Sequence, residues 1–234
     1  MQSLKSGSEV IHFDDRGPRE DFAIVFLNSL GTDFRVWDKL LDVLGERFRT
    51  VRMDKRGHGL STNYKKDISI ESLAKDVSVL VDSLNLKNIC VVGLSIGGLI
   101  ALELIRQRPN ICNKLILSDT APKIGSKDMW ADRIKRVKEG GIEAISDDIL
   151  ARWVSTSFLK YSVDELQMWR SMLTRTTKSG YIGCCEAIFR CDLTEQAKII
   201  NMPTLVIVGE EDGSTPINLC LLYTSPSPRD RTRS

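Results

Sequence analysis

Residues 88–98 read Asn-Ile-Cys-Val-Val-Gly-Leu-Ser-Ile-Gly-Gly. The apolar run before Gly93 predicts a buried strand, and apolar residues at helical spacing after Gly98 predict a helix. A Gly-x-Ser-x-Gly motif between a strand and a helix is typical of a sharp turn that presents a nucleophilic serine. We therefore predict that Ser95 is a nucleophile. The alternative, an incidental serine in a glycine-rich turn, is less favoured because both flanking patterns are present.

The composition is that of an ordinary globular protein of 234 residues, with 42% hydrophobic and 27% charged residues. The net charge of +2 gives no indication of nucleic-acid or membrane-surface binding. No apolar run is long enough to span a bilayer, and the first residues lack a signal-peptide core. The six cysteines have no zinc-site spacing, so we expect reduced thiols, no metal and a cytoplasmic location.

Apolar runs with strand character alternate with segments of helical pattern along most of the chain. The alternation predicts an α/β fold with a doubly wound, mostly parallel sheet. The segment 123–198 differs, because it has helical patterns, no buried-strand pattern and three of the four tryptophans. We therefore predict a core formed by residues 1–122 and 199–220, with 123–198 inserted as a helical cap. The predicted strands are 10–13, 23–27, 48–53, 88–92, 114–118 and 203–209.

An acidic loop, residues 210–216, follows the last predicted strand. In folds of this kind the acid partner of the nucleophile follows the serine in the chain and lies after a late strand. We therefore predict that Asp212 is this acid, because the Gly-Ser-Thr-Pro sequence after it predicts a turn that would aim its carboxylate. The two glutamates directly before Asp212 and a merely solvated acidic turn are the alternatives.

The histidine that completes a Ser–Asp–His order would follow Asp212, but the sequence contains only His12 and His58. The pattern places His12 in a strand, and it places His58 in a glycine-flanked loop that could line the mouth of the site or stabilise the turn. Residues 221–234 have neither helix nor strand pattern and resemble a non-native basic tail. We therefore interpret the sequence as truncated, without its last strand, last helix and catalytic histidine.

Five segments together resemble the α/β-hydrolase superfamily and, within it, the 3-oxoadipate enol-lactonases. The motif around Ser95 and the Arg-Gly-His-Gly loop at residues 56–59 are typical of the whole superfamily. The Asn28 loop and residues 181–185 are more specific to the lactonases. The sequence departs from the family pattern at residues 189–191, where the family tends to have an Arg-Asp pair. The matching segments are 28–38, 54–61, 93–98, 180–188 and 211–216.

The resemblance implies an α/β-hydrolase fold and the opening of 3-oxoadipate enol-lactone to 3-oxoadipate, within protocatechuate and catechol degradation. Ser95 would attack the lactone carbonyl and form an acyl-enzyme, while the backbone amides of Leu30 and Ile96 stabilise the oxyanion. Asp212 would orient the histidine base of the intact triad. The reaction requires no metal ion or organic cofactor. The expected partner is a small anionic lactone.

The free carboxylate of such a substrate favours a cationic side chain in the pocket. We predict Arg133 for this contact, with Trp130 and Trp153 as apolar walls. The alternatives are that Arg133 lies on a solvated helix face and that the tryptophans pack into the core. Two other functions stay open: a carboxylesterase or C–C bond hydrolase of the same fold, and a non-catalytic fragment.

Overall fold

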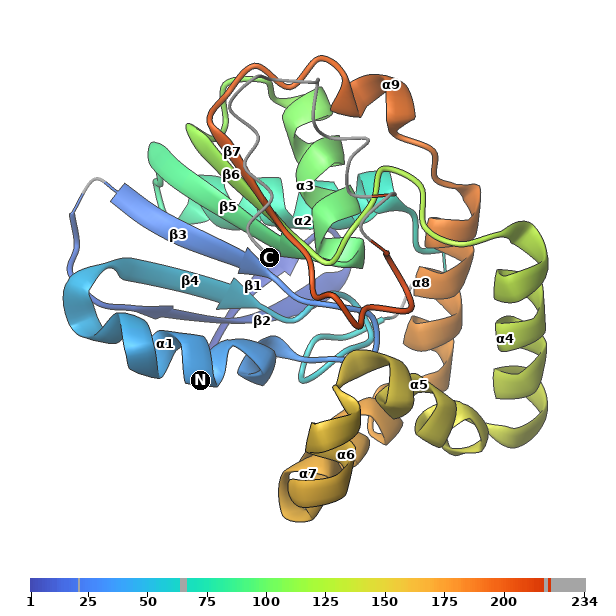
Figure 1. Ribbon diagram of the computed structural model, residues 1–234. Helices are drawn as coiled ribbons and strands as arrows, with labels where there is room; N and C mark the ends of the chain where they lie inside the picture. The colour runs from blue at the N-terminus through green and yellow to red at the C-terminus, as the bar shows by residue number, and fades with distance from the viewer. Residues whose placement is uncertain (21, 64–66, 217–218, 220–234) are drawn as a thin grey trace.

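The computed structural model describes residues 1–20, 22–63, 67–216 and 219, and within them the chain forms a seven-stranded sheet. Its strands are β1 Gln2–Ser6, β2 Glu9–Arg16, β3 Phe22–Leu27, β4 Arg49–Met53, β5 Asn88–Leu94, β6 Lys114–Ser118 and β7 Thr204–Ile207. The spatial order is β1-β2-β4-β3-β5-β6-β7, as the twisted sheet of Figure 1 shows. β2 runs antiparallel to β1 and β4, and the other neighbours are parallel. The predicted mostly parallel sheet is confirmed.

The central strands are buried on both faces because their side chains alternate between two apolar cores. In β3, Val25 packs into a large core that includes α2 (Ile70–Ser83) and α3 (Ile96–Gln107). Its neighbour Phe26 packs into a smaller core beside α1 (Asp38–Leu44). Successive side chains of a strand point to opposite faces, so a continuous apolar run is what a strand covered on both sides requires.

The helix α2 begins at a cap that its sequence encodes. The Ser69 side chain accepts a hydrogen bond from the Ser72 N–H, and the Ser72 hydroxyl oxygen accepts one from the Ser69 N–H. This reciprocal pair satisfies backbone donors that the first turn of a helix leaves free. Leu73, Val77 and Leu80, which are spaced three or four residues apart as on one face of a helix, are all buried.

The structure differs from the predicted strands at both edges of the sheet. Residues 2–6 form β1, which the sequence does not indicate because its side chains are mostly polar and exposed. β1 forms by pairing with β2, and β2 extends to Arg16, beyond the predicted end of this strand at residue 13. At the other edge, β7 ends earlier than predicted, and its residues Leu205 and Ile207 are 54% and 47% exposed.

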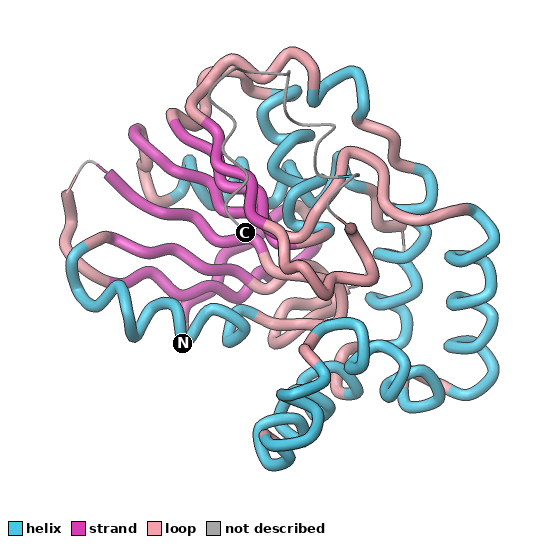
Figure 2. The backbone as a smooth tube through the Cα atoms, in the orientation of Figure 1, coloured by secondary structure: helices cyan, strands magenta, loops and turns pink. Residues whose placement is uncertain are grey.

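Between β6 and β7 the chain is helical, and residues 119–203, all of them described, contain no strand. Figure 2 shows most of these helices grouped beyond the ends of the strands. The α-helices are α4 Lys127–Gly140, α5 Ser146–Trp153, α6 Thr156–Tyr161, α7 Val163–Thr174, α8 Lys178–Arg190 and α9 Thr194–Ala197. In the described part of the chain, no helix combines the length and apolar character needed to cross a bilayer. The predicted tail, residues 221–234, lies outside the described residues.

Candidate active site

Ser95 lies in the sharp turn between β5 and α3, with φ 55° and ψ −119°. A positive φ is strained for a residue with a Cβ atom, and such strain is concentrated at functional sites. The neighbouring glycines are needed because backbone atoms approach closely. A Cβ atom on Gly97 would lie 2.1 Å from the Leu27 carbonyl oxygen, and one on Gly93 would lie 2.5 Å from the Gly97 carbonyl oxygen. The spacing of the Gly-x-Ser-x-Gly motif therefore follows from packing around the serine.

Two backbone N–H groups close to this turn have no acceptor among the described residues. One belongs to Ile96, the first residue of α3, and the other to Leu30, in the loop that follows β3. Leu30 and Ser95 line the same cavity. Free amides at a helix N-terminus and in an adjacent loop are the donors that an oxyanion requires. The arrangement suits the role predicted for Leu30 and Ile96.

The loop that carries Leu30 is held from the protein interior by Lys55. The Lys55 amine donates to the Ser29 carbonyl oxygen at 2.5 Å and to the Thr32 carbonyl oxygen at 3.2 Å. Burial lowers the pKa of Lys55 to about 8, from an ordinary value of 10.5. The side chain is therefore mostly an ammonium at neutral pH, with two carbonyl dipoles directed at it.

His58 holds the same loop from a second side. Its Nε2 atom accepts a hydrogen bond from the Gly31 N–H at 3.1 Å, and its Nδ1 atom lies 3.0 Å from the Arg56 carbonyl oxygen. Burial, with the charge of Lys55 as a second cause, holds the pKa of His58 well below 6.5. The imidazole is therefore neutral, with its proton on Nδ1. His58 stabilises the loop and does not line either cavity beside Ser95.

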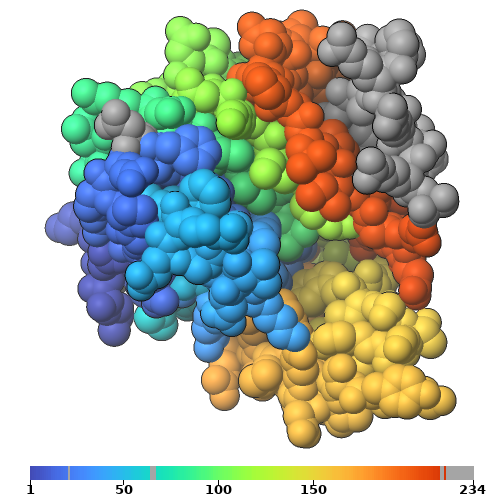
Figure 3. Space-filling view, turned by 60° about the vertical axis from the view of Figure 1, so that its left-hand side comes forward, coloured from blue at the N-terminus to red at the C-terminus, as the bar shows by residue number. Residues whose placement is uncertain are grey.

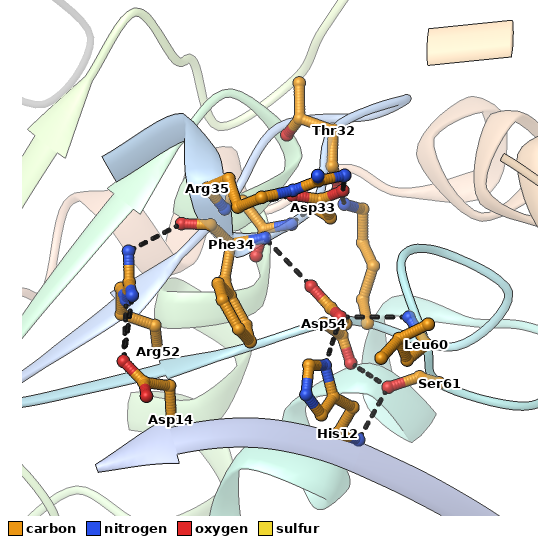
Figure 4. Close-up of polar contacts among 12 residues, drawn as sticks. His12, Asp14, Thr32, Asp33, Phe34, Arg35, Arg52, Asp54, Leu60 and Ser61 are labelled. Atoms are coloured by element: carbon orange, nitrogen blue, oxygen red, sulfur yellow. Dashed lines mark hydrogen bonds and ion pairs between the residues drawn. The ribbon is translucent and has the colours of Figure 1, made fainter. Parts of the chain in front are cut away.

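Asp54 directly follows β4, and its side chain connects the end of this strand to the helical turn Phe34–Trp37 after β3, as Figure 4 shows. Its carboxylate accepts hydrogen bonds from the Phe34 N–H at 2.8 Å and from the Leu60 N–H at 3.0 Å. The Nδ1 atom of His12 lies 2.8 Å from the same carboxylate. Both histidines of the chain thus support loops around the site, and neither contacts Ser95.

A cavity of about 550 Å³ opens beside Ser95, and we call it the outer cavity. Asp119, after β6, and Asp212, after β7, line it together with Trp153 and Trp169 from the helical segment. Figure 3 shows the recess between the yellow helical segment and the orange-red chain near β7. The two residues predicted as nucleophile and acid therefore face one space. Its lining residues are Ser29, Thr32, Val36, Leu94, Ser95, Asp119, Arg152, Trp153, Val154, Ser155, Trp169, Gly209, Glu210, Glu211, Asp212, Ser214 and Thr215.

The Asp212 carboxylate is fixed by its own turn. Its Oδ1 atom accepts hydrogen bonds from the N–H groups of Ser214 at 2.7 Å and Thr215 at 3.2 Å, and its Oδ2 atom accepts one from the Thr215 hydroxyl at 2.5 Å. Asp119 holds the start of this loop, since its Oδ1 atom accepts a hydrogen bond from the Gly209 N–H at 2.9 Å. The turn predicted after Asp212 therefore forms.

A second cavity, of about 70 Å³, borders Ser95 on the side of α4 and α8, and we call it the inner cavity. Trp130 is buried in its wall and donates a hydrogen bond from Nε1 to the Ile124 carbonyl oxygen at 2.7 Å. The Arg133 guanidinium lies over the Trp130 ring, 4.7 Å from its centroid. Trp153 lines both cavities. Trp130, Arg133 and Trp153, the three residues predicted to bind the substrate, therefore border the space beside Ser95.

Three further residues line the site that are not among the predicted site residues, although Ser29 and Tyr181 lie in segments that resemble the lactonases. Ser29 and Arg152 border both cavities, and Tyr181 closes the inner one from α8. Burial raises the pKa of the Tyr181 hydroxyl, and a hydrogen bond with Arg133 opposes this rise. Arg152 directly precedes Trp153, and that adjacency is the one feature of the sequence that points to it.

The thiols of the described residues are not arranged for catalysis or metal binding. Five cysteines are free, and burial raises the pKa of Cys184 to about 12, so that this thiol stays protonated and unreactive. Within the described residues, no group of three or more His, Cys, Asp or Glu side chains is placed to hold a metal ion.

Comparison with known proteins decides the family. Residues 23–140 match the family model of the alpha/beta hydrolase fold. The 3-oxoadipate enol-lactonase 2 of Acinetobacter baylyi is 30% identical over 215 residues, which cover 92% of this chain and 80% of that protein. The chain belongs to the enol-lactonase family of α/β hydrolases.

Further relatives of this family support the assignment. The 3-oxoadipate enol-lactonase 1 of the same organism is 34% identical, over 86% of this chain and 75% of its own length. The crystal structure of the enol-lactonase from Burkholderia xenovorans superposes with a TM-score of 0.91 at 32% identity, covering 95% of this chain and 86% of that one. The predicted α/β-hydrolase fold is therefore confirmed.

Proposed function

We propose that this protein opens an enol-lactone that carries a free carboxylate, of the 3-oxoadipate type, by attack of Ser95 on the lactone carbonyl. The observation that carries the proposal is that a strained serine and an aspartate line one cavity, beside two backbone amides that have no acceptor among the described residues. The substrate class is taken from the two 3-oxoadipate enol-lactonases of Acinetobacter baylyi. In this proposal the reaction belongs to the degradation of protocatechuate and catechol.

The chemistry follows from the positions of these groups. The Ser95 Oγ atom forms an ester bond to the lactone carbonyl carbon, and the ring C–O bond breaks. The amides of Leu30 and Ile96 donate to the oxyanion, a contribution that is typically about 3 kcal/mol for each donor. The leaving enol takes a proton and tautomerises to a ketone, and water then cleaves the ester. No fragment leaves in the first step, because both halves belong to one ring.

Arg133 is our candidate for the carboxylate of the substrate. It borders the inner cavity beside Ser95, and it has no ion-pair partner among the described residues. A guanidinium that stacks on an aromatic ring is also held in place for an incoming anion. Trp130 and Trp153 would form the apolar walls around the lactone ring.

The proton acceptor for Ser95 is not supplied by either histidine of the chain. His58 forms hydrogen bonds with the backbone of Gly31 and Arg56, and His12 forms one with the Asp54 carboxylate. Loss of a triad histidine lowers kcat by roughly a millionfold in a comparable serine hydrolase. We therefore propose that the 234-residue protein turns over slowly. The engagement of both histidines away from Ser95 is the observation that favours the non-catalytic alternative. The outer cavity, at about 550 Å³, has room for a free imidazole to act in place of the side chain.

The test measures enol-lactone opening and 4-nitrophenyl acetate hydrolysis with increasing imidazole. The proposal expects imidazole to restore lactone opening, after subtraction of the rate of the Ser95→Ala variant at the same imidazole concentration. Restored hydrolysis of the aryl ester alone would favour the carboxylesterase alternative. Equal rates for the wild-type chain and Ser95→Ala on both substrates would leave only the non-catalytic alternative.

A further inference from the structure

The two cavities that meet at Ser95 differ in charge. Among the described residues, the outer cavity is lined by the four carboxylates of Asp119, Glu210, Glu211 and Asp212 and by one arginine, Arg152. Two arginines line the inner cavity, and none of its described lining residues is acidic. An anion is therefore attracted into the inner cavity and repelled from the outer one.

Arg133 and Arg152 differ from Arg136, Arg170 and Arg190, three arginines of the helical segment that form ion pairs. Arg136 lies 2.7 Å from an oxygen of Asp148, and Arg190 pairs with a glutamate of its own helix. Neither Arg133 nor Arg152 has a carboxylate partner in the part of the chain that the structure describes. Two cationic side chains without an ion-pair partner among the described residues, both bordering one small cavity, favour the binding of an anion there.

We propose that Arg152 is a specificity-determining residue, which together with Arg133 makes the inner cavity a site for dicarboxylates. The inference rests on the proposed function, because hydrolysis of a lactone with a free carboxylate creates a second carboxylate. Arg133 binds the carboxylate that the substrate already has. Arg152 borders both cavities beside Ser95 and binds the carboxylate that forms there. The product therefore makes one more ion pair than the substrate, and dicarboxylates of similar length compete with the substrate.

The test compares adipate with hexanoate, two chains of six carbons that differ by one carboxylate. Each is titrated into the 234-residue protein, and binding is followed by tryptophan fluorescence, since Trp130 and Trp153 line the inner cavity. We expect adipate to bind about tenfold more tightly, the effect of one additional charge-assisted hydrogen bond. The preference is expected to shrink as salt is added. Equal affinities for the two acids would overturn the inference.

Substitutions assign the effect to the two arginines. Arg152→Gln is expected to bring the ratio of the two affinities close to one, and Arg152→Lys to keep part of the preference. Arg133→Gln is expected to weaken the binding of both adipate and hexanoate. Arg136→Gln is the matched control, because Arg136 lies on the same helix as Arg133 and lines neither cavity. A folded Arg152→Gln variant, verified by circular dichroism, that keeps the tenfold ratio would refute the role of Arg152.

The binding experiment involves no turnover, so its failure can be told from failure of the proposed function. A preference for adipate without any lactone opening would support the dicarboxylate site and contradict the proposed reaction. Lactone opening that depends on Ser95, with equal affinity for the two acids, would support the reaction and remove the dicarboxylate site.

Discussion

Replacing Lys55 with methionine is expected to change how the stability of the protein depends on pH. Burial lowers the pKa of Lys55 from 10.5 to about 8. At about 1.4 kcal/mol per pKa unit, this difference corresponds to about 3 kcal/mol of unfavourable free energy for burying the ammonium. The substitution leaves neither loop carbonyl unpaired: the Ser29 oxygen still accepts from the Thr32 hydroxyl, and the Thr32 oxygen from the Asn28 amide.

The direction of this pH dependence follows from the protons that Lys55 binds in the folded and the unfolded chain. Below pH 8, Lys55 is protonated in both the folded and the unfolded chain, and its burial lowers the free energy of unfolding by the full amount. Between pH 8 and 10.5 the unfolded chain keeps a proton that the folded protein has lost. The contribution of Lys55 to the free energy of unfolding therefore rises with pH across this window. The Lys55→Met variant lacks this rise.

The assay is urea unfolding of both proteins from pH 7 to pH 10, followed by tryptophan fluorescence. Lys55 interacts electrostatically with Cys184 and His58, but burial is the largest cause at both groups. Between pH 7 and 10 burial keeps the Cys184 thiol protonated, with a pKa of about 12, and keeps His58 neutral, so the difference between the two proteins reports Lys55. We expect the stability of the variant relative to wild type to fall by about 2 to 3 kcal/mol over this range. Parallel pH curves for the two proteins would refute the reasoning.

Three further substitutions test other parts of the structure. Gly97→Ala places a Cβ atom 2.1 Å from the Leu27 carbonyl oxygen and is expected to lower the free energy of unfolding by about 3 kcal/mol, measured by urea unfolding; an unchanged midpoint would contradict the close packing of the turn. Asp212→Ala removes three hydrogen bonds and is expected to lower the imidazole-restored rate of lactone opening at least about tenfold. Glu210→Gln is the control, and equal rates for Asp212→Ala and the wild-type protein would show that Asp212 is not the acid. Leu205→Lys places a charge on the exposed strand β7 and is expected to slow aggregation, measured by light scattering. Aggregation at the wild-type rate would contradict this expectation.

The parts of the fold that the sequence predicts are those with a strong local pattern. The run before Gly93 and the two glycines around Ser95 determine a strand, a turn and a helix within a few residues. The stripe of Leu73 and Val77 similarly determines a buried helix face. In each case the signal and the structure that it specifies lie in the same short segment.

The parts that the sequence does not predict depend on contacts between distant segments. β1 is polar and becomes a strand only by pairing with β2. Lys55 reads as a loop lysine, yet it is buried against two carbonyl groups more than twenty residues earlier. Arg152 lies in a charged helical stretch and is exposed, and only the packing of α5 near Ser95 places it at the border of both cavities.

The nucleophilic role of Ser95 is tested most directly by trapping its acyl-enzyme. The protein is mixed with the enol-lactone and imidazole and quenched in acid, and the digested peptides are analysed by mass spectrometry. Because ring opening releases no fragment, we predict that the peptide containing Ser95 gains the mass of the intact lactone. Consumption of the lactone at an equal rate by Ser95→Ala, with no adduct on the wild-type peptide, would contradict the role of this serine.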